Sequence, residues 1–248
     1  MDGYCYPRLF AHRGGGALAP ENTVAGIRLA ARLGYRGVEF DVMLSGDGMP
    51  VLIHDESLER TTDGAGDVAQ TPLAELRLLD AGIRFHRAFG GETVPRLEEA
   101  LDCCARLGLT ANIEIKPAAG LAEETGRTVG RIVASGDPGA VLLSSFSEAA
   151  LAAARLTAPA VPRALLFEAV PSDWQLRLSR LECLALHCAA RHLTPELAAA
   201  WVAAGIPFAC YTVNGRAAAA QLFAAGAASL FTDRLDLFDP RNPDGPGC

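Results

Sequence analysis

The architecture can be inferred from GVEFDV, residues 37–42, and from the stretches that share its character. GVEFDV is a short apolar run that contains two acidic residues. Seven further short apolar runs, separated by longer segments of helical periodicity, occupy residues 8–12, 111–116, 140–144, 162–167, 183–187, 207–212 and 229–233. Because short strands that alternate with helices are typical of a parallel sheet, these eight runs predict an α/β fold, a closed TIM (β/α)8 barrel.

Two segments depart from this alternation. VLIHD at 51–55 has the character of a ninth strand, but too few residues separate it from 37–42 for a parallel crossover. We therefore predict that it returns antiparallel, through a tight turn at Asp47 and Gly48. The polar run at about 56–95 is predicted to be a small insertion on the barrel rim after the second strand, either a lid over the site or a rigid cap.

Length and composition favour a single domain over residues 1–248, because one α/β barrel commonly has this length. The hydrophobic content of 50% and the charged content of 21% are typical of a soluble globular protein. The net charge of −7 argues against general binding to nucleic acid or to an anionic membrane. No apolar run could cross a bilayer and MDGYCYPRLF lacks signal-peptide features, so we expect a cytoplasmic protein without membrane insertion.

The cysteines are expected to be small apolar core residues. They form an odd-numbered set without CxxC spacing, which argues against a disulfide framework and against a zinc site. The set is Cys5, Cys103, Cys104, Cys183, Cys188, Cys210 and Cys248.

Acidic side chains within two predicted strands indicate a metal site. Glu39 and Asp41 lie two residues apart and therefore share a face of their strand, as do Glu114 and Lys116 on another strand. Ionised groups buried in a barrel must be paired or must bind a metal. We predict one divalent cation held by Glu39, Asp41 and Glu114, the alternative being a salt-bridge network with Lys116 and Arg13. Oxygen ligands favour Mg²⁺ or Ca²⁺ without choosing between them.

Two histidines are expected at the same end of the barrel. His12 ends the first predicted strand, and the hairpin brings His54 back beside Asp41. With Arg13 and Lys116 close by, this set suits the cleavage of a phosphoric ester. One imidazole would accept a proton from the nucleophile and the other would donate one to the leaving oxygen, while the cations stabilise the phosphate. The alternative for each histidine taken singly is a packing or capping role.

Three glycines, Gly14 to Gly16, follow Arg13. They are predicted to let the chain turn sharply after the first strand and to let a phosphate approach the backbone. The alternative is a plain glycine turn.

The chain resembles the glycerophosphodiester phosphodiesterases, and most closely the cytosolic bacterial members of that family. The motifs that carry the resemblance follow the family's order: YPRLFAHRGGGALAPENT, VEFDVMLSGDG, LIHDESLERTTDG, VPRLEEAL, ANIEIKP, LLSSF, YTVN and FTDRLDLF. The resemblance implies a TIM barrel with a small insertion after its second strand. It also implies hydrolysis of glycerophosphodiesters, such as glycerophosphocholine or glycerophosphoethanolamine, to sn-glycerol 3-phosphate and an alcohol.

The same resemblance implies roles for individual residues. It assigns the metal carboxylates to Glu39, Asp41 and Glu114, the acid/base pair to His12 and His54, and the phosphate-holding cations to Arg13 and Lys116. Two further substrate contacts are expected. Tyr211 stands where many members carry tryptophan, and His187 ends its predicted strand, although packing is the alternative for both.

Two other functions stay open. A phospholipase C- or D-like phosphodiesterase of (lyso)lipids would act at membranes and would show exposed apolar or basic loops. A catalytically inactive barrel that binds a phosphorylated ligand would be favoured by the loss of a carboxylate or a histidine. The expected partner is a small-molecule glycerophosphodiester and not a nucleic acid, and the oligomeric state is left open, a homodimer included.

Overall fold

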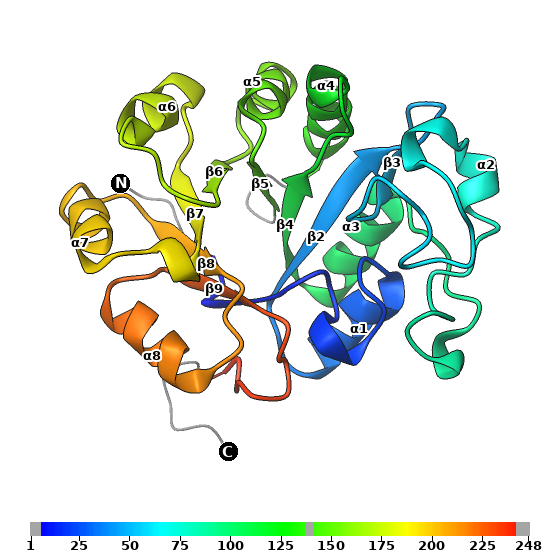
Figure 1. Ribbon diagram of the computed structural model, residues 1–248, viewed down its shortest axis with the longest axis horizontal. Helices are drawn as coiled ribbons and strands as arrows, with labels where there is room; N and C mark the ends of the chain where they lie inside the picture. The colour runs from blue at the N-terminus through cyan, green and yellow to red at the C-terminus, as the bar shows by residue number, and fades with distance from the viewer. Residues whose placement is uncertain (1–5, 137–140, 242–248) are drawn as a thin grey trace.

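The computed structural model, which describes residues 6–136 and 141–241, contains a closed barrel of parallel strands (Figure 1). Pairing between β1 and β2 closes the ring, and each barrel strand runs parallel to its neighbours. The barrel strands are β1 (Leu9–Ala11), β2 (Gly37–Leu44), β4 (Thr110–Ile115), β5 (Val141–Ser145), β6 (Arg163–Phe167), β7 (Ala185–Ala189), β8 (Phe208–Tyr211) and β9 (Ser229–Thr232). The predicted TIM barrel is confirmed.

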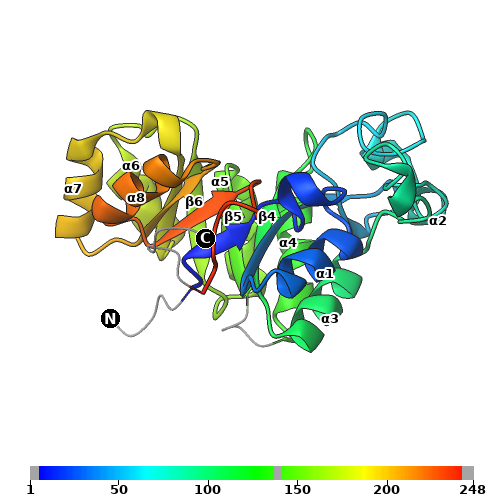
Figure 2. The ribbon, with the colours of Figure 1, turned by 90° about the horizontal axis from the view of Figure 1, so that it is seen from below.

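Helices follow the barrel strands and cover the outside of the ring (Figures 1 and 2). Hydroxyl side chains cap several of them: Thr23 accepts a hydrogen bond from the amide of Gly26, and Ser147 accepts one from the amide of Ala150. The helices are α1 (Val24–Arg32), α3 (Leu97–Leu107), α4 (Ala122–Val133), α5 (Glu148–Thr157), α6 (Trp174–Leu181), α7 (Pro195–Ala203) and α8 (Arg216–Ala224), with short 3-10 turns η1 (Gly16–Leu18) and η5 (Ala190–His192).

Strand β3 (Pro50–Leu52) pairs antiparallel with β2, as the short connection predicts. It is shorter than the predicted strand 51–55 and ends before His54. The amide of Ile53 still donates to the carbonyl of Asp41, at 3.2 Å, and the chain then leaves the ladder. The hairpin therefore ties the backbone next to His54 directly to the backbone of Asp41.

The predicted rim insertion is a compact unit on one side of the barrel, beyond β3 (Figures 1 and 2). It contains α2 (Leu73–Leu76) and the turns η2 (Val68–Gln70) and η3 (Arg87–Phe89). Its two ends meet, because the amide of Leu52 donates to the carbonyl of Pro95 at 2.9 Å. A small apolar core of its own holds it together: Met43, Val51, Ile53, Leu58, Val68, Leu76, Ala81 and Val94.

Other sequence predictions can be compared with the structure. Cys103, Cys104, Cys183, Cys188 and Cys210 are buried free thiols, which confirms their core role. Cys5 and Cys248 lie outside the described residues, as does Ala140 at the start of one predicted strand. Within the described part of the chain, no helix combines the length and the apolar character needed to cross a bilayer.

Candidate active site

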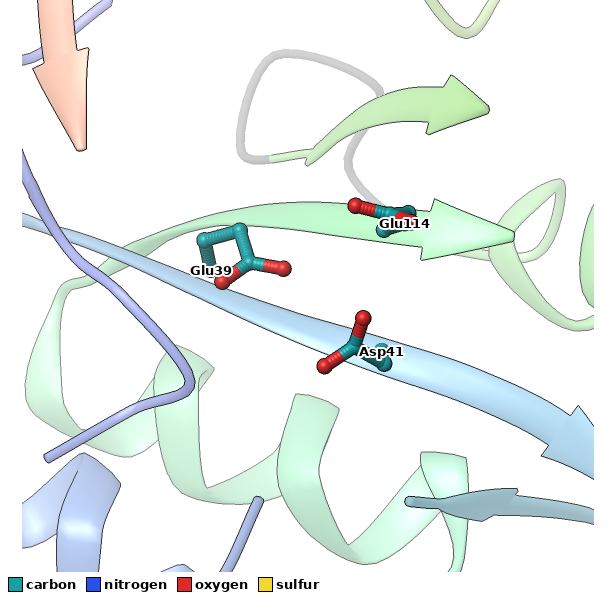
Figure 3. A group of neighbouring side chains, drawn as sticks. All are labelled: Glu39, Asp41 and Glu114. Atoms are coloured by element: carbon teal, nitrogen blue, oxygen red, sulfur yellow. The ribbon is translucent and has the colours of Figure 1, made fainter. Parts of the chain in front are cut away.

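Three carboxylates converge inside the barrel, Glu39 and Asp41 from β2 and Glu114 from β4 (Figure 3). The register places Asp41 opposite Glu114, and one oxygen from each of the three groups lies within 4.8 Å of the others. Glu39 is 3% exposed and Asp41 is 2% exposed. Three acidic groups are thus held together, two of them buried and Glu114 half-buried.

Burial and mutual repulsion disfavour the ionised form of this cluster. Burial and then the charge of Asp41 raise the pKa of Glu39 to about 7, and burial followed by the charges of Asp41 and Glu39 raises that of Glu114. The Oε1 atom of Glu39 is buried and has no hydrogen-bond partner among the described residues. An orphaned buried oxygen among clustered carboxylates fits a hard divalent cation, which takes oxygen ligands.

The chain around the cluster fixes the carboxylates. The amide of Arg13 donates to Glu39 Oε2 at 2.8 Å. The side chain of Asn22 donates from Nδ2 to Asp41 Oδ2 at 2.9 Å and accepts from the amide of Asp41 at 3.1 Å. Each of these contacts leaves another oxygen of the same carboxylate for a further partner. The loop after β1 therefore orients the cluster.

His12 is held by a chain of hydrogen bonds from the end of β9. Its Nδ1 lies 2.6 Å from Asp233 Oδ1, and Asn214 donates to the other oxygen of Asp233 at 2.9 Å. The Nε2 of His12 lies 3.8 Å from Glu39 Oε2. Burial lowers the pKa of His12, but the hydrogen bond to Asp233 and the charge of Glu39 outweigh it, so that the pKa is raised. The surroundings of His12 therefore shift it toward the protonated form.

His54 has a different environment. Its Nδ1 lies 2.7 Å from Asp55 Oδ1, and the Lys116 ammonium contacts its Nε2. Burial lowers the pKa of His54, and the charges of Arg13 and Lys116 lower it further, against the opposing charge of Asp41. The ring is therefore neutral near pH 7. An acid/base pair requires two groups whose surroundings shift their pKa values in opposite directions, as the surroundings of His12 and His54 do.

Arg13 lies between the carboxylate cluster and the insertion. Its Nη1 donates to Glu21 Oε1 at 3.0 Å, and its Nε lies 3.8 Å from Asp41 Oδ2. Glu21 also accepts two hydrogen bonds from Arg60, at 2.7 and 2.8 Å, and Arg60 pairs with Asp55. Arg13 and Lys116, which lies 4.0 Å from Asp41 Oδ1, are thus both beside the cluster, as the sequence predicts.

The glycines after Arg13 act through backbone packing. Gly14 and Gly16 have positive φ angles of 80° and 53°, which confirms the predicted sharp turn. A Cβ atom on Gly15 would lie 2.6 Å from the Cβ of Ala19, and one on Gly16 would lie 2.4 Å from the carbonyl oxygen of Asp233. The missing side chains therefore make room for neighbouring atoms of the protein itself. The approach of a phosphate to the backbone of Gly14 to Gly16 stays a prediction.

His187 and Tyr211 line one small cavity together with His12, Glu39 and Glu114. Strand β7 covers residues 185–189, so His187 is in the middle of its strand, not at the end as predicted. It is 1% exposed, burial lowers its pKa to about 3, and its Nε2 has no partner among the described residues. The Tyr211 hydroxyl donates to the Phe167 carbonyl at 2.8 Å, which leaves the ring face to line the cavity.

The structure brings the predicted site residues together, although His187 lies in the interior of the barrel and not at its mouth. It also adds residues that the sequence reasoning did not assign. The unassigned residues are Glu21, Asn22, Asp55, Arg60, Asn214 and Asp233. Asp233 ends the last predicted strand, 229–233, just as His12 ends the first. That position could have suggested Asp233, although it does not identify its partner.

Comparisons with known proteins cover nearly the whole chain. A family model described as the glycerophosphoryl diester phosphodiesterase family matches residues 12–237. A glycerophosphodiester phosphodiesterase from Caldanaerobacter subterraneus subsp. tengcongensis is 34% identical over 229 residues, which are 91% of this chain and 93% of that protein.

Solved structures agree with the sequence comparisons. A phosphodiesterase from Oleispira antarctica, in complex with the product sn-glycerol-3-phosphate, has a TM-score of 0.89 and 40% identity, covering 92% of this chain and 93% of that one. A glycerophosphodiester phosphodiesterase from Agrobacterium tumefaciens has a TM-score of 0.80 and 28% identity, covering 93% and 97%. The matched region of the family model contains all the site residues described above.

Proposed function

Because the chain belongs to the glycerophosphoryl diester phosphodiesterase family, we propose that it hydrolyses glycerophosphodiesters to sn-glycerol 3-phosphate and an alcohol. The class of enzyme, a phosphoric diester hydrolase, follows from the family. Glycerophosphocholine and glycerophosphoethanolamine are the proposed substrates. The observation that carries the proposal is the convergence of three carboxylates, two of them buried and the third half-buried, with two carboxylate-paired histidines.

Glu39, Asp41 and Glu114 would hold one divalent cation, Mg²⁺ or Ca²⁺. When bound, such a cation supplies positive charge that stabilises oxygens of the reacting phosphate. The residues themselves support this proposal, since their oxygens are crowded, Glu39 and Asp41 are buried, and Glu39 Oε1 has no hydrogen-bond partner among the described residues. Arg13 and Lys116 would hold the phosphate from the side of His54.

The two histidines would move the protons. The neutral His54 is suited to accept a proton on Nε2, because Asp55 binds its Nδ1. The protonated His12 is suited to donate one from Nε2, because Asp233 binds its Nδ1. Pairing with a carboxylate fixes the orientation of each ring and, for the neutral His54, its tautomer. His187 and Tyr211 would contact the glycerol moiety in the cavity that they share with Glu39.

The direct test is the release of glycerol 3-phosphate, measured in a coupled dehydrogenase assay. We expect release from glycerophosphocholine and glycerophosphoethanolamine, loss of activity with EDTA, and its return on addition of Mg²⁺ or Ca²⁺. Binding of either diester without any release would favour the inactive barrel instead. Wild-type activity that persists in full after EDTA treatment would contradict the metal assignment.

Replacing Asp233 with asparagine is expected to lower kcat on the order of 10²-fold, the lower end of what a general acid or base contributes. The substitution removes the main favourable partner of protonated His12, so the pKa of His12 should fall. The alkaline limb of the pH profile should then move to lower pH. Kinetics across pH and NMR titration of His12 would measure both effects.

The matched control is Asp236→Asn. Asp236 lies on the same segment but pairs with Arg234 and does not contact His12. An alkaline limb that stays in place in Asp233→Asn would show that the Asp233 carboxylate does not set the protonation of His12.

The metal-free protein is expected to lose stability as the pH rises from about 4.5 to about 7. The folded state holds a proton on Glu39 up to about pH 7, whereas the unfolded chain releases it near the ordinary value of 4.5. The free energy of unfolding decreases with pH wherever the folded state binds more protons than the unfolded state. A bound cation offsets the repulsion of the ionised carboxylates, so Mg²⁺ or Ca²⁺ should raise the Tm more at pH 8 than at pH 5.

Thermal melting at both pH values, with EDTA and with added cation, checks this expectation. Glu39→Gln is the control variant, because it cannot ionise and should show a smaller fall in Tm between the two pH values. Cation-induced shifts of equal size at pH 5 and pH 8 would speak against a cation on these carboxylates.

The lipid alternative has one structural observation in its favour. Leu78, Ile83 and Phe85 are large apolar side chains of the insertion that are 83%, 43% and 44% exposed. Exposed apolar residues near a site are typical of enzymes that act at membranes. Product analysis with a lysolipid beside glycerophosphocholine separates the two functions. We further propose that residues 1–248 act as one domain in the cytoplasm, on a small-molecule substrate.

A further inference from the structure

A second pocket lies beside the proposed site, between the loop after β1 and the insertion. Its volume is about 180 Å³, and it is lined by Pro20, Glu21, Arg60, Thr61, Ala81, Arg84 and Phe85. A narrow cavity with His54 in its wall shares Glu21, Thr61 and Ala81 with this pocket. The pocket is therefore adjacent to the cavity beside His54.

The two cavities around the site have different characters. The cavity that contains Glu39, His187 and Tyr211 is small and lies inside the barrel. The pocket of the insertion is wider, and it shares no lining residue with the inner cavity. A glycerophosphodiester has one invariant half, glycerol, and one half that varies in size and charge. The smaller inner cavity suits the invariant half, and the larger pocket suits the variable alcohol.

The charges in the pocket do not cancel. Glu21 pairs with Arg13 and Arg60, and Arg60 also pairs with Asp55, so that these two cations and two carboxylates offset one another. Arg84 is the remaining charged side chain of the wall. Its Nε donates to the carbonyl of Thr62 at 2.6 Å. Within residues 6–136 and 141–241 no carboxylate forms an ion pair with it, so the Arg84 guanidinium gives the pocket a net positive charge.

We propose that this pocket binds the alcohol half of the diester and that Arg84 selects an alcohol that carries a carboxylate. The inference rests on the proposed hydrolysis of glycerophosphodiesters. With Nε on the Thr62 carbonyl, the guanidinium is fixed, and its Nη donors are left for an anion. A guanidinium binds a carboxylate through charge-assisted hydrogen bonds. A cationic alcohol would meet a like charge in the same place.

Glycerophosphoserine and glycerophosphoethanolamine form a matched pair of substrates, because their alcohols differ by one carboxylate. We expect the wild-type kcat/KM to be higher for glycerophosphoserine. Arg84→Gln should lower kcat/KM for glycerophosphoserine by about tenfold, the effect of losing one solvent-accessible charged hydrogen bond. It should raise kcat/KM for glycerophosphoethanolamine, because the substitution removes the like charge that the cationic alcohol meets. Arg87→Gln is the control variant, since Arg87 belongs to the same segment but does not line the pocket.

The outcomes separate the inference from the function on which it rests. An unchanged ratio of the two kcat/KM values in Arg84→Gln, or an equal loss with both diesters, overturns the role of Arg84. Failure of the wild type to release glycerol 3-phosphate from either diester overturns the proposed function, and the inference with it. Should Arg84→Gln melt at a lower temperature, Arg84→Lys provides the same comparison, because it keeps the charge but loses the paired donors. In Arg84→Lys, a reduced ratio of kcat/KM for glycerophosphoserine to kcat/KM for glycerophosphoethanolamine supports the inference, and an unchanged ratio counts against it.

Discussion

His12→Ala and His54→Ala are each expected to lower kcat by about 10²–10⁴-fold, the usual contribution of a general acid or base. Each substitution removes the one ring that can transfer a proton at its position, because the neighbouring carboxylates, Asp233 and Asp55, hold no proton near pH 7. Burial raises the pKa of Asp233, but the hydrogen bond to His12 outweighs it, so that the pKa is lowered. Steady-state kinetics of glycerol 3-phosphate release measure the loss.

The barrel should stay folded in both variants. The backbone of residue 12 keeps its hydrogen bond to the Thr232 carbonyl, and the backbone next to residue 54 stays tied to Asp41. Circular dichroism and the Tm check the fold. His192→Ala serves as the control, because His192 is exposed and lines none of the cavities described above. Near-normal turnover in either site variant would defeat the acid/base assignment.

Glu114→Gln is expected to have opposite effects on function and on stability. It removes one of three charged ligands, so the affinity for the divalent cation should fall by at least about 100-fold. Even the loss of a residue that only hydrogen-bonds to a metal ligand typically lowers metal affinity 10–100-fold. Activity at low cation concentration should fall with it. In the metal-free protein, the same change removes a buried charge whose pKa is raised by burial and by Asp41 and Glu39, so the Tm should rise above that of the wild type near pH 8.

Isothermal titration with Mg²⁺ and Ca²⁺, kinetics across cation concentration, and melting in EDTA test the three parts separately. Glu123→Gln is the control, because Glu123 pairs with Arg127 on the surface of α4 and is remote from the cluster. A Glu114→Gln variant that binds cation as tightly as the wild type would remove Glu114 from the ligand set. A lower Tm in EDTA would show that the carboxylates do not repel one another in the folded protein.

The sequence contained enough to predict the barrel and the set of residues at its mouth. The spacing of the short apolar runs reflects strands and helices that form locally, and the two-residue spacing of Glu39 and Asp41 fixes their common face whatever the rest of the chain does. The antiparallel return of β3 followed from length alone, since the connection is too short for a crossover. These are local constraints, which a sequence shows directly.

The exact position of a strand and the hydrogen-bond partners of the site residues depend on contacts between residues that are distant in sequence. The strand predicted at 183–187 lies at 185–189, because Cys183 still donates its amide to the Leu178 carbonyl at the end of α6. This shift moves His187 from the mouth to the interior. The pairing of His12 with Asp233 joins residues separated by 221 positions, and no pattern within either segment indicates it.

The meeting of the two ends of the insertion has a consequence for how such enzymes diversify. With Leu52 bonded to Pro95 and an antiparallel bridge between Val51 and Arg96, the intervening forty or so residues enter and leave the barrel at a single point. Replacing the part of this segment that follows Asp55 with a longer, shorter or differently charged one would leave the barrel strands and the imidazole of His54 in place. Natural variation or engineering of these residues could therefore change the preferred alcohol without changing the proposed catalytic residues.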